Sequence, residues 1–516
     1  MTRRARWGLL IGLGGILLGI VLPAAGLVWF LQPAAPKEPL ALRIDTAGPY
    51  VILATKRSTG TYASAIEKAR ALHAGAGRID FEPDDLDDVL DALQKVQPRY
   101  ALVFIQPDEL DVNFAWRWLT MTSRIDDDPF VDLRTGFVTG ATPEAALAFV
   151  ERIAAVASGR VRIPGACVDN LGPAELAPAA SFNTFPGAMM LPGALSERFT
   201  PRSISHGKSG FTDDRLATLD GAGFVHFGGH GHPDRIDDGL RAAQVPGLAL
   251  APCIVFNGAC YTGVTGRWFD ETTGVTAEKT VTADDSFCLQ MLQKEVAGYL
   301  AALHPDHGMP VYQEMEYLAF AGASLGDVIK HTYDGVVLGA GGKLPKFEPL
   351  VAGADSSFTT PADVMLKGTA ARILLGDPAL IVCDGFLPAP FTFKIADEDG
   401  RLRITAAVTS ADLKSTFTDT YHNDLNPQAP FNDRALLVID LPSDWPAVGK
   451  VDVVGVKVGR QALPHRLVGY AVESDQGSRK LHVQVDVPAT GFQTSAFRIV
   501  GATVELIARR PGTGGR

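Results

Sequence analysis

Short apolar runs alternate with longer segments of mixed polarity between residues 49 and 386. The runs at 50–54 and 100–105 carry no charged residue and are too short for helices, which is typical of strands buried on both faces. Alternating strands and helices predict an α/β fold with a largely parallel sheet. Further strands are expected at 224–228, 253–256, 298–303 and 372–375, and helices at 64–72, from residue 84, from residue 142 and at 285–295.

The pattern changes beyond about residue 387, where apolar and polar residues alternate one by one. Residues 402–408 form one such run, and they follow an Asp399-Gly400 dipeptide that is typical of a hairpin turn. Residues 387–516 are therefore predicted to form a β-sandwich, immunoglobulin-like by its number of strands. The disulfide of that fold is not expected, because no cysteine follows Cys383.

The N-terminus carries the pattern of a membrane anchor. Three arginines at positions 3, 4 and 6 precede an uncharged, mostly apolar run over residues 7–31, which exceeds the roughly 20 residues that cross a bilayer. We expect a cytoplasmic stub at 1–6, a single transmembrane helix at 7–31 and a proline-rich linker at 32–48. The bulk of the chain would then lie outside the cytoplasm, in a periplasm or outside the cell.

A cleaved signal peptide is the alternative for residues 7–31, because Pro23-Ala24-Ala25-Gly26 interrupts the apolar run with small residues. Either interpretation predicts an exported protein with the remaining domains outside the cytoplasm. In the anchored form the chain would be a single-pass protein of the cell membrane, with the membrane itself as one partner.

Charge and cysteine content exclude some classes of function. The formal net charge is -11, which repels a phosphate backbone, so nucleic acid is not expected as a partner. The five cysteines include no Cys-x-x-Cys pair and are too sparse for a disulfide framework or a zinc knuckle. Cys253 and Cys288 fall in apolar surroundings typical of the core.

Candidate chemistry lies at the ends of two predicted strands. The first strand ends in Gly228-Gly229-His230-Gly231, and the second ends in Asn257-Gly258-Ala259-Cys260. If the strands are neighbours in a parallel sheet, their ends lie at one edge and the imidazole can meet the thiol. A histidine beside a cysteine favours the reactive thiolate. The backbone N–H groups of Gly231 and Cys260 would then form an oxyanion hole.

At these residues the sequence resembles the gingipain-like cysteine peptidases, relatives of caspases and legumains, which carry His-Gly after one strand and Ala-Cys after the next. Two further stretches resemble that family, one at 126–136 followed by Thr142-Pro143, and one at 374–380. The resemblance covers about residues 50–500. It implies a caspase-like fold in two subdomains, at 49–165 and 166–386, ahead of an immunoglobulin-like domain.

By this resemblance the chain is a thiol endopeptidase acting on protein or peptide substrates. Cys260 would be the nucleophile, and His230 would protonate the leaving amine. His232 stands where the family usually has a small residue, and Asp234 and Asn257 are candidate supporting residues. No cofactor is expected. Some family members bind calcium, and calcium is left open because no residue pattern here assigns a site.

Two other functions are compatible with the sequence. His230-x-His232-x-Asp234 matches part of a zinc-ligand pattern of metal-dependent hydrolases, although Arg235 stands where that pattern continues with histidine. A non-catalytic surface or assembly protein with a peptidase-like fold is the second alternative. Asp126, Asp127 and Asp128 form a charge run that is expected to be a solvated face, with a cation site as the sharper interpretation.

Overall fold

The structure is a computed structural model in which the chain divides into two compact units, Met1–Lys37 and Glu38–Arg516. The predicted stub and anchor, and residues 32–36 of the predicted linker, lie outside the described residues. Residues 37–48 of the linker are described, and they contain two short strands that pair with the rest of the chain, Lys37–Leu40 and Arg43–Ile44. In the part of the chain that the structure describes, no helix has the length and apolar character needed to cross a membrane. The described residues are 37–173, 200–206, 212–236, 239–305, 314–315, 317–318, 323–356, 361–382, 391–398, 400–409, 416–417, 431–445, 447–475, 477–489 and 499–511.

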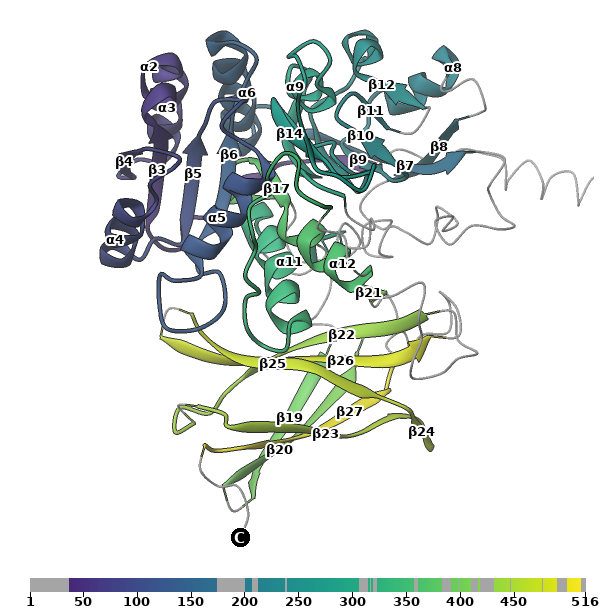
Figure 1. Ribbon diagram of the computed structural model, residues 1–516. Coiled ribbons are helices and arrows are strands. Elements are labelled where there is room, and N and C mark those ends of the chain that lie inside the picture. The colour runs from purple at the N-terminus through teal and green to yellow at the C-terminus, as the bar shows by residue number, and fades with distance from the viewer. Residues whose placement is uncertain are drawn as a thin grey trace, which may run out of the picture. The chain divides into compact units, whose positions relative to one another are not determined.

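The larger part of the chain is built on an eleven-stranded sheet (Figure 1). Its strand order is β1-β7-β9-β13-β16-β17-β6-β5-β3-β4, with β8 beside β7. The strands are β1 (Lys37–Leu40), β3 (Tyr50–Thr55), β4 (Gly77–Phe81), β5 (Tyr100–Phe104), β6 (Arg134–Val138), β7 (Ile163–Pro173), β8 (Thr200–His206), β9 (Phe224–Phe227), β13 (Cys253–Asn257), β16 (Val296–Ala302) and β17 (Arg372–Gly376).

The sheet is largely parallel, as predicted, with one reversal. Strands β9, β13 and β16 pair in parallel, and so do β3, β4, β5 and β6. Strand β17 runs antiparallel to β16 and parallel to β6, so it joins the two halves of the sheet. The reversal was not predicted, because a short apolar run carries no information on its direction.

Strand β13 shows why the apolar runs are uninterrupted. Cys253 and Val255 belong to a hydrophobic cluster on one face of the sheet, together with residues of α9, and Cys288 is buried there too. Ile254 and Phe256 belong to a second cluster, together with residues of α11. Both faces are buried, so every position of the strand is apolar. The burial of Cys253 and Cys288 confirms their prediction as core residues.

Several helices begin at side-chain caps that the sequence partly reveals. Thr142 accepts a hydrogen bond from the Ala145 N–H at 3.2 Å and precedes Pro143, as predicted for a helix start. The helix expected from residue 84 begins at Asp87, and the one expected over 285–295 is limited to 287–292. The helices are α2 (Lys56–Thr61), α3 (Ala63–Leu72), α4 (Asp87–Val96), α5 (Val112–Thr122), α6 (Pro143–Ala157), α8 (Asp213–Leu216), α9 (Phe287–Leu292), α11 (Leu325–Gly339) and α12 (Pro361–Ala370).

Among the described residues, three short antiparallel sheets accompany the main sheet, and two of them follow the strand ends at which chemistry is expected. One joins β10 (Gly231–His232), β11 (Arg235–Ile236) and β12 (Leu240–Arg241). A second is the pair of β14 (Arg267–Asp270) and β15 (Ala277–Thr280), and a third pairs β2 (Arg43–Ile44) with β18 (Leu380–Ile381). None was predicted, since two to four residues are too few to show a period.

The C-terminal region consists of two antiparallel sheets that share one buried hydrophobic cluster (Figure 1). The Asp399-Gly400 hairpin is confirmed by the pairing of β19 with β20, in which Glu398 faces Arg401. The immunoglobulin-like topology stays a prediction. The strands are β19 (Phe391–Glu398), β20 (Arg401–Val408), β27 (Thr503–Arg509), β23 (Lys450–Val458) and β24 (Gln461–Leu463) in one sheet, and β21 (Thr416–Phe417), β22 (Phe431–Asp440), β26 (Ser478–Ala489) and β25 (Arg466–Asp475) in the other.

A buried charge cluster connects α11 to the second of these sheets. Lys330 lies 2.9 Å from both carboxylate oxygens of Asp334 and 2.7 Å from Glu473, and His482 lies 2.7 Å from Glu473. All four side chains are buried. Burial alone would lower the pKa of Lys330, but the two carboxylates hold it above its ordinary value. The ammonium therefore stays charged and compensates both anions.

Replacing that lysine tests the cluster. Lys330→Met is expected to lower the free energy of unfolding by about 3–5 kcal/mol, because two buried carboxylates lose their cation. Chemical denaturation of the purified chain measures the change. Lys346→Met removes the 2.7 Å pair with Glu348 at an exposed position and is expected to leave stability nearly unchanged, because solvent screens such a pair. Equal effects of the two substitutions would contradict a dominant role for the buried cluster.

Candidate active site

The two predicted site segments leave neighbouring strands at the same edge of the sheet. Strands β9 and β13 pair in parallel, with Phe227 opposite Asn257, and the Gly258 N–H donates to the Phe227 carbonyl at 2.8 Å. His230 follows the first of these strand ends and Cys260 follows the second, at equal distance along the chain. The pairing register therefore directs both turns to one edge, which is where parallel α/β sheets carry their sites.

The two turns are in direct contact at Gly231. A Cβ atom built on Gly231 would lie 2.2 Å from the Cys260 carbonyl oxygen and 2.8 Å from the Cys260 backbone nitrogen. Only glycine permits this approach, since any side chain would overlap the backbone of the neighbouring turn. His230 is exposed and Cys260 is half-buried, so solvent reaches this edge at both residues.

A buried hydrogen-bond network fixes the turn that carries Cys260. The Asn257 carboxamide accepts from the Ala259 N–H at 2.9 Å and donates to the Tyr299 hydroxyl at 3.0 Å. The Tyr299 hydroxyl donates to the Thr262 carbonyl at 2.9 Å, and the Thr262 hydroxyl donates to the Ala259 carbonyl at 2.7 Å. From the sequence, Asn257 was a candidate supporting residue of the site. The structure buries it completely, beneath the turn rather than on the cleft surface.

An ion pair inside the core reaches the same turn from the neighbouring part of the sheet. Arg372 in β17 donates to both carboxylate oxygens of Glu314, at 2.6 and 2.7 Å, and to the Asn257 carbonyl at 3.0 Å. Arg372 and Glu314 are completely buried. The sequence interpretation treated 372–375 only as an apolar strand and missed this pair. A charged residue at the start of a buried strand was the available signal.

Tyr261 follows Cys260 and has a left-handed backbone, with φ at 60°. L-residues rarely adopt this conformation, so the turn is held by its surroundings. The buried Tyr261 ring lies 5.0 Å from the Trp268 ring in an edge-to-face contact and 6.3 Å from the His304 ring. His304 pairs with Glu271 at 2.8 Å, with both side chains fully buried. The packing of Trp268 and His304 around Tyr261 therefore supports the turn that carries Cys260.

The residues of the zinc-ligand alternative do not gather around one point. His232 pairs with Arg235 in the β10–β11 hairpin, and Asp234 accepts from the Arg235 guanidinium at 3.0 and 3.1 Å. Burial and the charge of Arg235 lower the pKa of His232. Within the described ranges, the ligand atoms of His230, His232 and Asp234 do not form a group with metal-binding spacing. The geometry gives the zinc interpretation no support.

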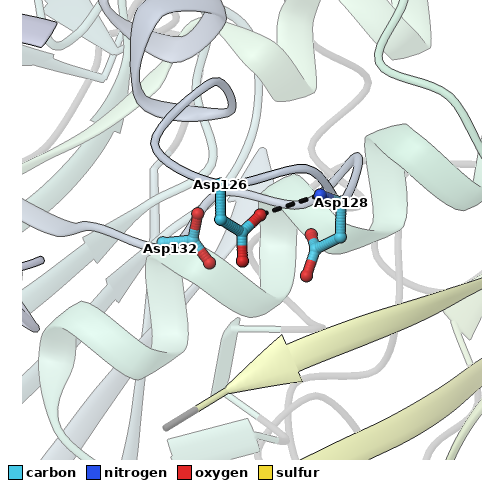
Figure 2. Close-up of side chains that lie close together, drawn as sticks. All are labelled: Asp126, Asp128 and Asp132. Carbon is cyan, nitrogen blue, oxygen red and sulfur yellow. Dashed lines mark hydrogen bonds between the residues drawn. The ribbon is translucent and has the colours of Figure 1, made fainter. Parts of the chain in front are cut away.

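The described residues contain a group with such spacing elsewhere, formed by Asp126, Asp128 and Asp132 (Figure 2). One ligand oxygen from each lies within 4.8 Å of the others. The solvated face expected for this run is found at Asp127, which is exposed, whereas Asp126 and Asp128 are half-buried and Asp128 accepts from the Ser474 N–H at 2.6 Å. An oxygen-only set suits a hard cation such as calcium better than zinc. Calcium binding stays open, as it was from the sequence.

Crowding of the three carboxyl groups changes their ionisation. Burial, together with its like-charged neighbours, raises the pKa of Asp132 to about 8. Burial also raises the pKa of Asp128, to about 6, against the hydrogen bonds from Ser474 and Phe130. One oxygen of Asp132 is buried without a hydrogen-bond partner. A proton on Asp132 therefore stabilises the folded chain in the neutral range.

Comparisons with known proteins give similarity at the level of structure alone. No family model matches the sequence, and no curated protein matches it. A solved structure described as "Complex of Porphyromonas gingivalis RgpB pro- and mature domains" aligns with 89% of this chain and 99% of its own, at 9% identity and a TM-score of 0.44. Another, described as "Structure of Protease", aligns with 90% and 98%, at 9% identity and a TM-score of 0.43.

The contact between the two turns can be tested at Gly231. Gly231→Ala is expected to lower the free energy of unfolding by about 1–3 kcal/mol, because its Cβ overlaps the Cys260 backbone. Denaturation curves of the purified chain provide the measurement. Gly247→Ala is the matched control, since its Cβ would meet no atom within 4 Å. If the two variants unfold alike, the two turns are not in contact.

The acidic cluster predicts a pH-dependent stability. The pKa of Asp132 is raised on folding from about 3.9 to about 8, so the folded chain holds a proton on Asp132 that the unfolded chain has already released. The stability that this proton provides is complete below pH 4 and is lost as the pH rises to 8. Asp132→Asn cannot ionise and avoids this loss. We expect the variant to match wild type near pH 4 and to exceed it by on the order of 5 kcal/mol at pH 8.

Denaturation at both pH values, in the presence of a chelator, measures this difference. The chelator removes cations that would otherwise compensate the ionised carboxylates. Asp127→Asn, at the exposed neighbouring position, controls for the loss of one negative charge. A constant difference between Asp132→Asn and wild type across this range would show that Asp132 does not titrate there.

Proposed function

We propose that the chain is a cysteine peptidase with Cys260 as nucleophile and His230 as general acid and base. The observation that supports this most is the contact of Gly231 with the backbone of Cys260, at the shared edge of β9 and β13. It brings a turn with an exposed imidazole against a turn with a half-buried thiol. Few structural roles require a histidine–glycine turn to meet a cysteine turn this closely.

The proposed reaction begins with the Cys260 thiolate attacking the carbonyl carbon of a peptide bond. A carbon–sulfur bond forms, and the carbonyl electrons move to oxygen, where the N–H groups of Gly231 and Cys260 would stabilise the charge. His230 then gives its proton to the amide nitrogen, and the carbon–nitrogen bond breaks. The products of this half-reaction are a free amine and a thioester on Cys260.

Water completes the proposed cycle. His230, now neutral, takes a proton from a water molecule as that water attacks the thioester carbonyl. The carbon–sulfur bond breaks, and the thiolate and a carboxylic acid result. If an amine replaces water in this step, the same residues carry out transpeptidation. Neither half-reaction requires a cofactor.

The rigid surroundings of Cys260 support a catalytic role. Effective catalysis requires the nucleophile to be held in a productive geometry before substrate arrives. The Asn257–Tyr299–Thr262 network and the guanidinium of Arg372 fix the turn from below. A cysteine that served only as a small apolar residue would need none of these hydrogen bonds.

The proposal includes a location and a partner class. The substrates would be proteins or peptides outside the cytoplasm, and the helix predicted at 7–31 would hold the enzyme at the membrane. The net charge of -11 argues against nucleic acid as a substrate. Acidic residues 126, 128 and 132 are the proposed place for calcium, should the enzyme bind it.

The dyad is tested by labelling the full-length chain with peptide acyloxymethyl ketones, in which a thiolate displaces a carboxylate and forms a thioether. We expect modification at Cys260, located by mass mapping of peptides. Cys260→Ala should abolish the labelling, and His230→Ala should slow it by about 10²-fold or more, because the thiolate loses its stabilising imidazolium.

His465→Ala, at a histidine in the C-terminal region, is the control and should label like wild type. Circular dichroism and denaturation must show that each variant is folded. Labelling that persists in Cys260→Ala would refute the proposed nucleophile. Peptide hydrolysis that survives complete alkylation of Cys260 but is lost with a chelator would favour a metal-dependent hydrolase instead.

A further inference from the structure

A pocket of about 350 Å³ lies between two short hairpins that follow the two site turns along the chain. Its walls come from the β10–β11 hairpin on one side and the β14–β15 hairpin on the other. A volume of this size accommodates one large amino-acid side chain. The lining residues are Pro233, Asp234, Trp268, Lys279, Thr280 and Val281.

The lining of the pocket is connected to both site turns through neighbouring residues. Pro233 directly follows β10, the short strand that begins at Gly231. On the other side, the Trp268 ring contacts Tyr261, the residue after Cys260, with 5.0 Å between ring centroids. A substrate bound with its scissile carbonyl at Cys260 would therefore have a neighbouring side chain within reach of this pocket.

The charges around the pocket are compensated within the chain. Asp234 pairs with Arg235, and Lys279 pairs with Asp270 at 2.5 Å. Although burial acts to raise it, the pKa of Asp270 is lowered to about 2 by hydrogen bonds from Lys279 and Thr272, so this carboxylate stays ionised. The two carboxylates and the two basic side chains together carry no formal net charge.

Apart from Thr280, the remaining lining residues of the pocket are apolar or aromatic. Trp268 is partly exposed, and the Lys279 ammonium lies 5.3 Å from its ring centroid. That cation occupies the position over the ring that the cation of a basic substrate side chain would prefer. Pro233 and Val281 contribute apolar surface and no charge. A basic side chain would meet Lys279, and an acidic one would meet Asp234.

We propose that this pocket selects the substrate by receiving a large uncharged side chain, aromatic in preference, next to the bond that is cleaved. The inference rests on the proposed peptidase function. In this arrangement Lys279 is a specificity-determining residue, because it neutralises Asp270 and covers Trp268, and both effects disfavour arginine and lysine in the substrate.

The experiment uses full-length protein and a panel of acyloxymethyl ketone probes that differ in the side chain next to the reactive carbon. The panel contains tyrosine, phenylalanine, leucine, alanine, arginine, lysine and aspartate. The second-order rate of inactivation is measured for each probe. We expect the aromatic probes to react about tenfold or more faster than the arginine, lysine and aspartate probes.

Lys279→Met is expected to increase the relative reactivity of basic probes, and a misfolded variant would not produce such an increase. The substitution leaves Asp270 as an uncompensated carboxylate and exposes the Trp268 ring, so arginine and lysine probes should gain about five- to tenfold relative to tyrosine. Lys346→Met is the matched control, because it also breaks a lysine–carboxylate pair but lies outside the pocket lining. It should leave the order of probes unchanged.

A second variant tests the aromatic wall. Trp268→Ala should remove the preference for aromatic probes, and Trp268→Phe should retain most of it, because stacking needs a ring at this position. Comparing the two separates loss of the pocket surface from loss of support for Tyr261. The ratio of rates between probes is the readout, since a general loss of activity lowers all rates together.

The outcomes separate this inference from the function on which it rests. Labelling that depends on Cys260 but favours arginine or lysine in the wild-type chain would overturn the inference and leave the peptidase intact. The same holds if Lys279→Met does not change the order of probes. No labelling by any probe, in protein shown to be folded, would overturn both.

Discussion

The close approach of Gly231 to the backbone of Cys260 is the contact on which the site depends. It requires β9 and β13 to be neighbours in the observed register, with Phe227 opposite Asn257, because a slip of one residue would move one turn along the edge. It also requires a residue without Cβ at position 231. The contact thus depends both on the register of β9 against β13 and on glycine at position 231.

The support beneath this point is polar and buried, which is expensive in free energy unless every group is satisfied. Arg372 is buried completely, yet it donates to two oxygens of Glu314 and to the Asn257 carbonyl. An apolar residue at 372 would pack at lower cost and would leave that carbonyl unfixed. We therefore interpret the ion pair as a device for positioning the turn more than for stability.

The sequence predicts the local features of this protein better than the distant ones. Strands buried on both faces, the Asp399-Gly400 hairpin and the two glycine-containing strand ends are visible because each depends on adjacent residues. The Arg372 side chain bonds the Asn257 carbonyl 115 residues away, and the Asn113 side chain bonds the Leu350 backbone 237 residues away. No local sequence pattern reveals hydrogen bonds between residues so far apart. The reversed strand β17 was missed for a related reason, since direction depends on the chain path between strands.

The pocket and the dyad belong to different kinds of structure, and this difference has a consequence. Cys260 and His230 lie in turns that follow two buried strands, and the pairing of those strands in the core fixes where the turns lie. Trp268 and Lys279 lie on a short two-stranded hairpin at the surface, where one charge can change at little cost in stability. Substrate preference can therefore vary by substitution in the hairpin while the sheet edge that would carry the reaction stays unchanged.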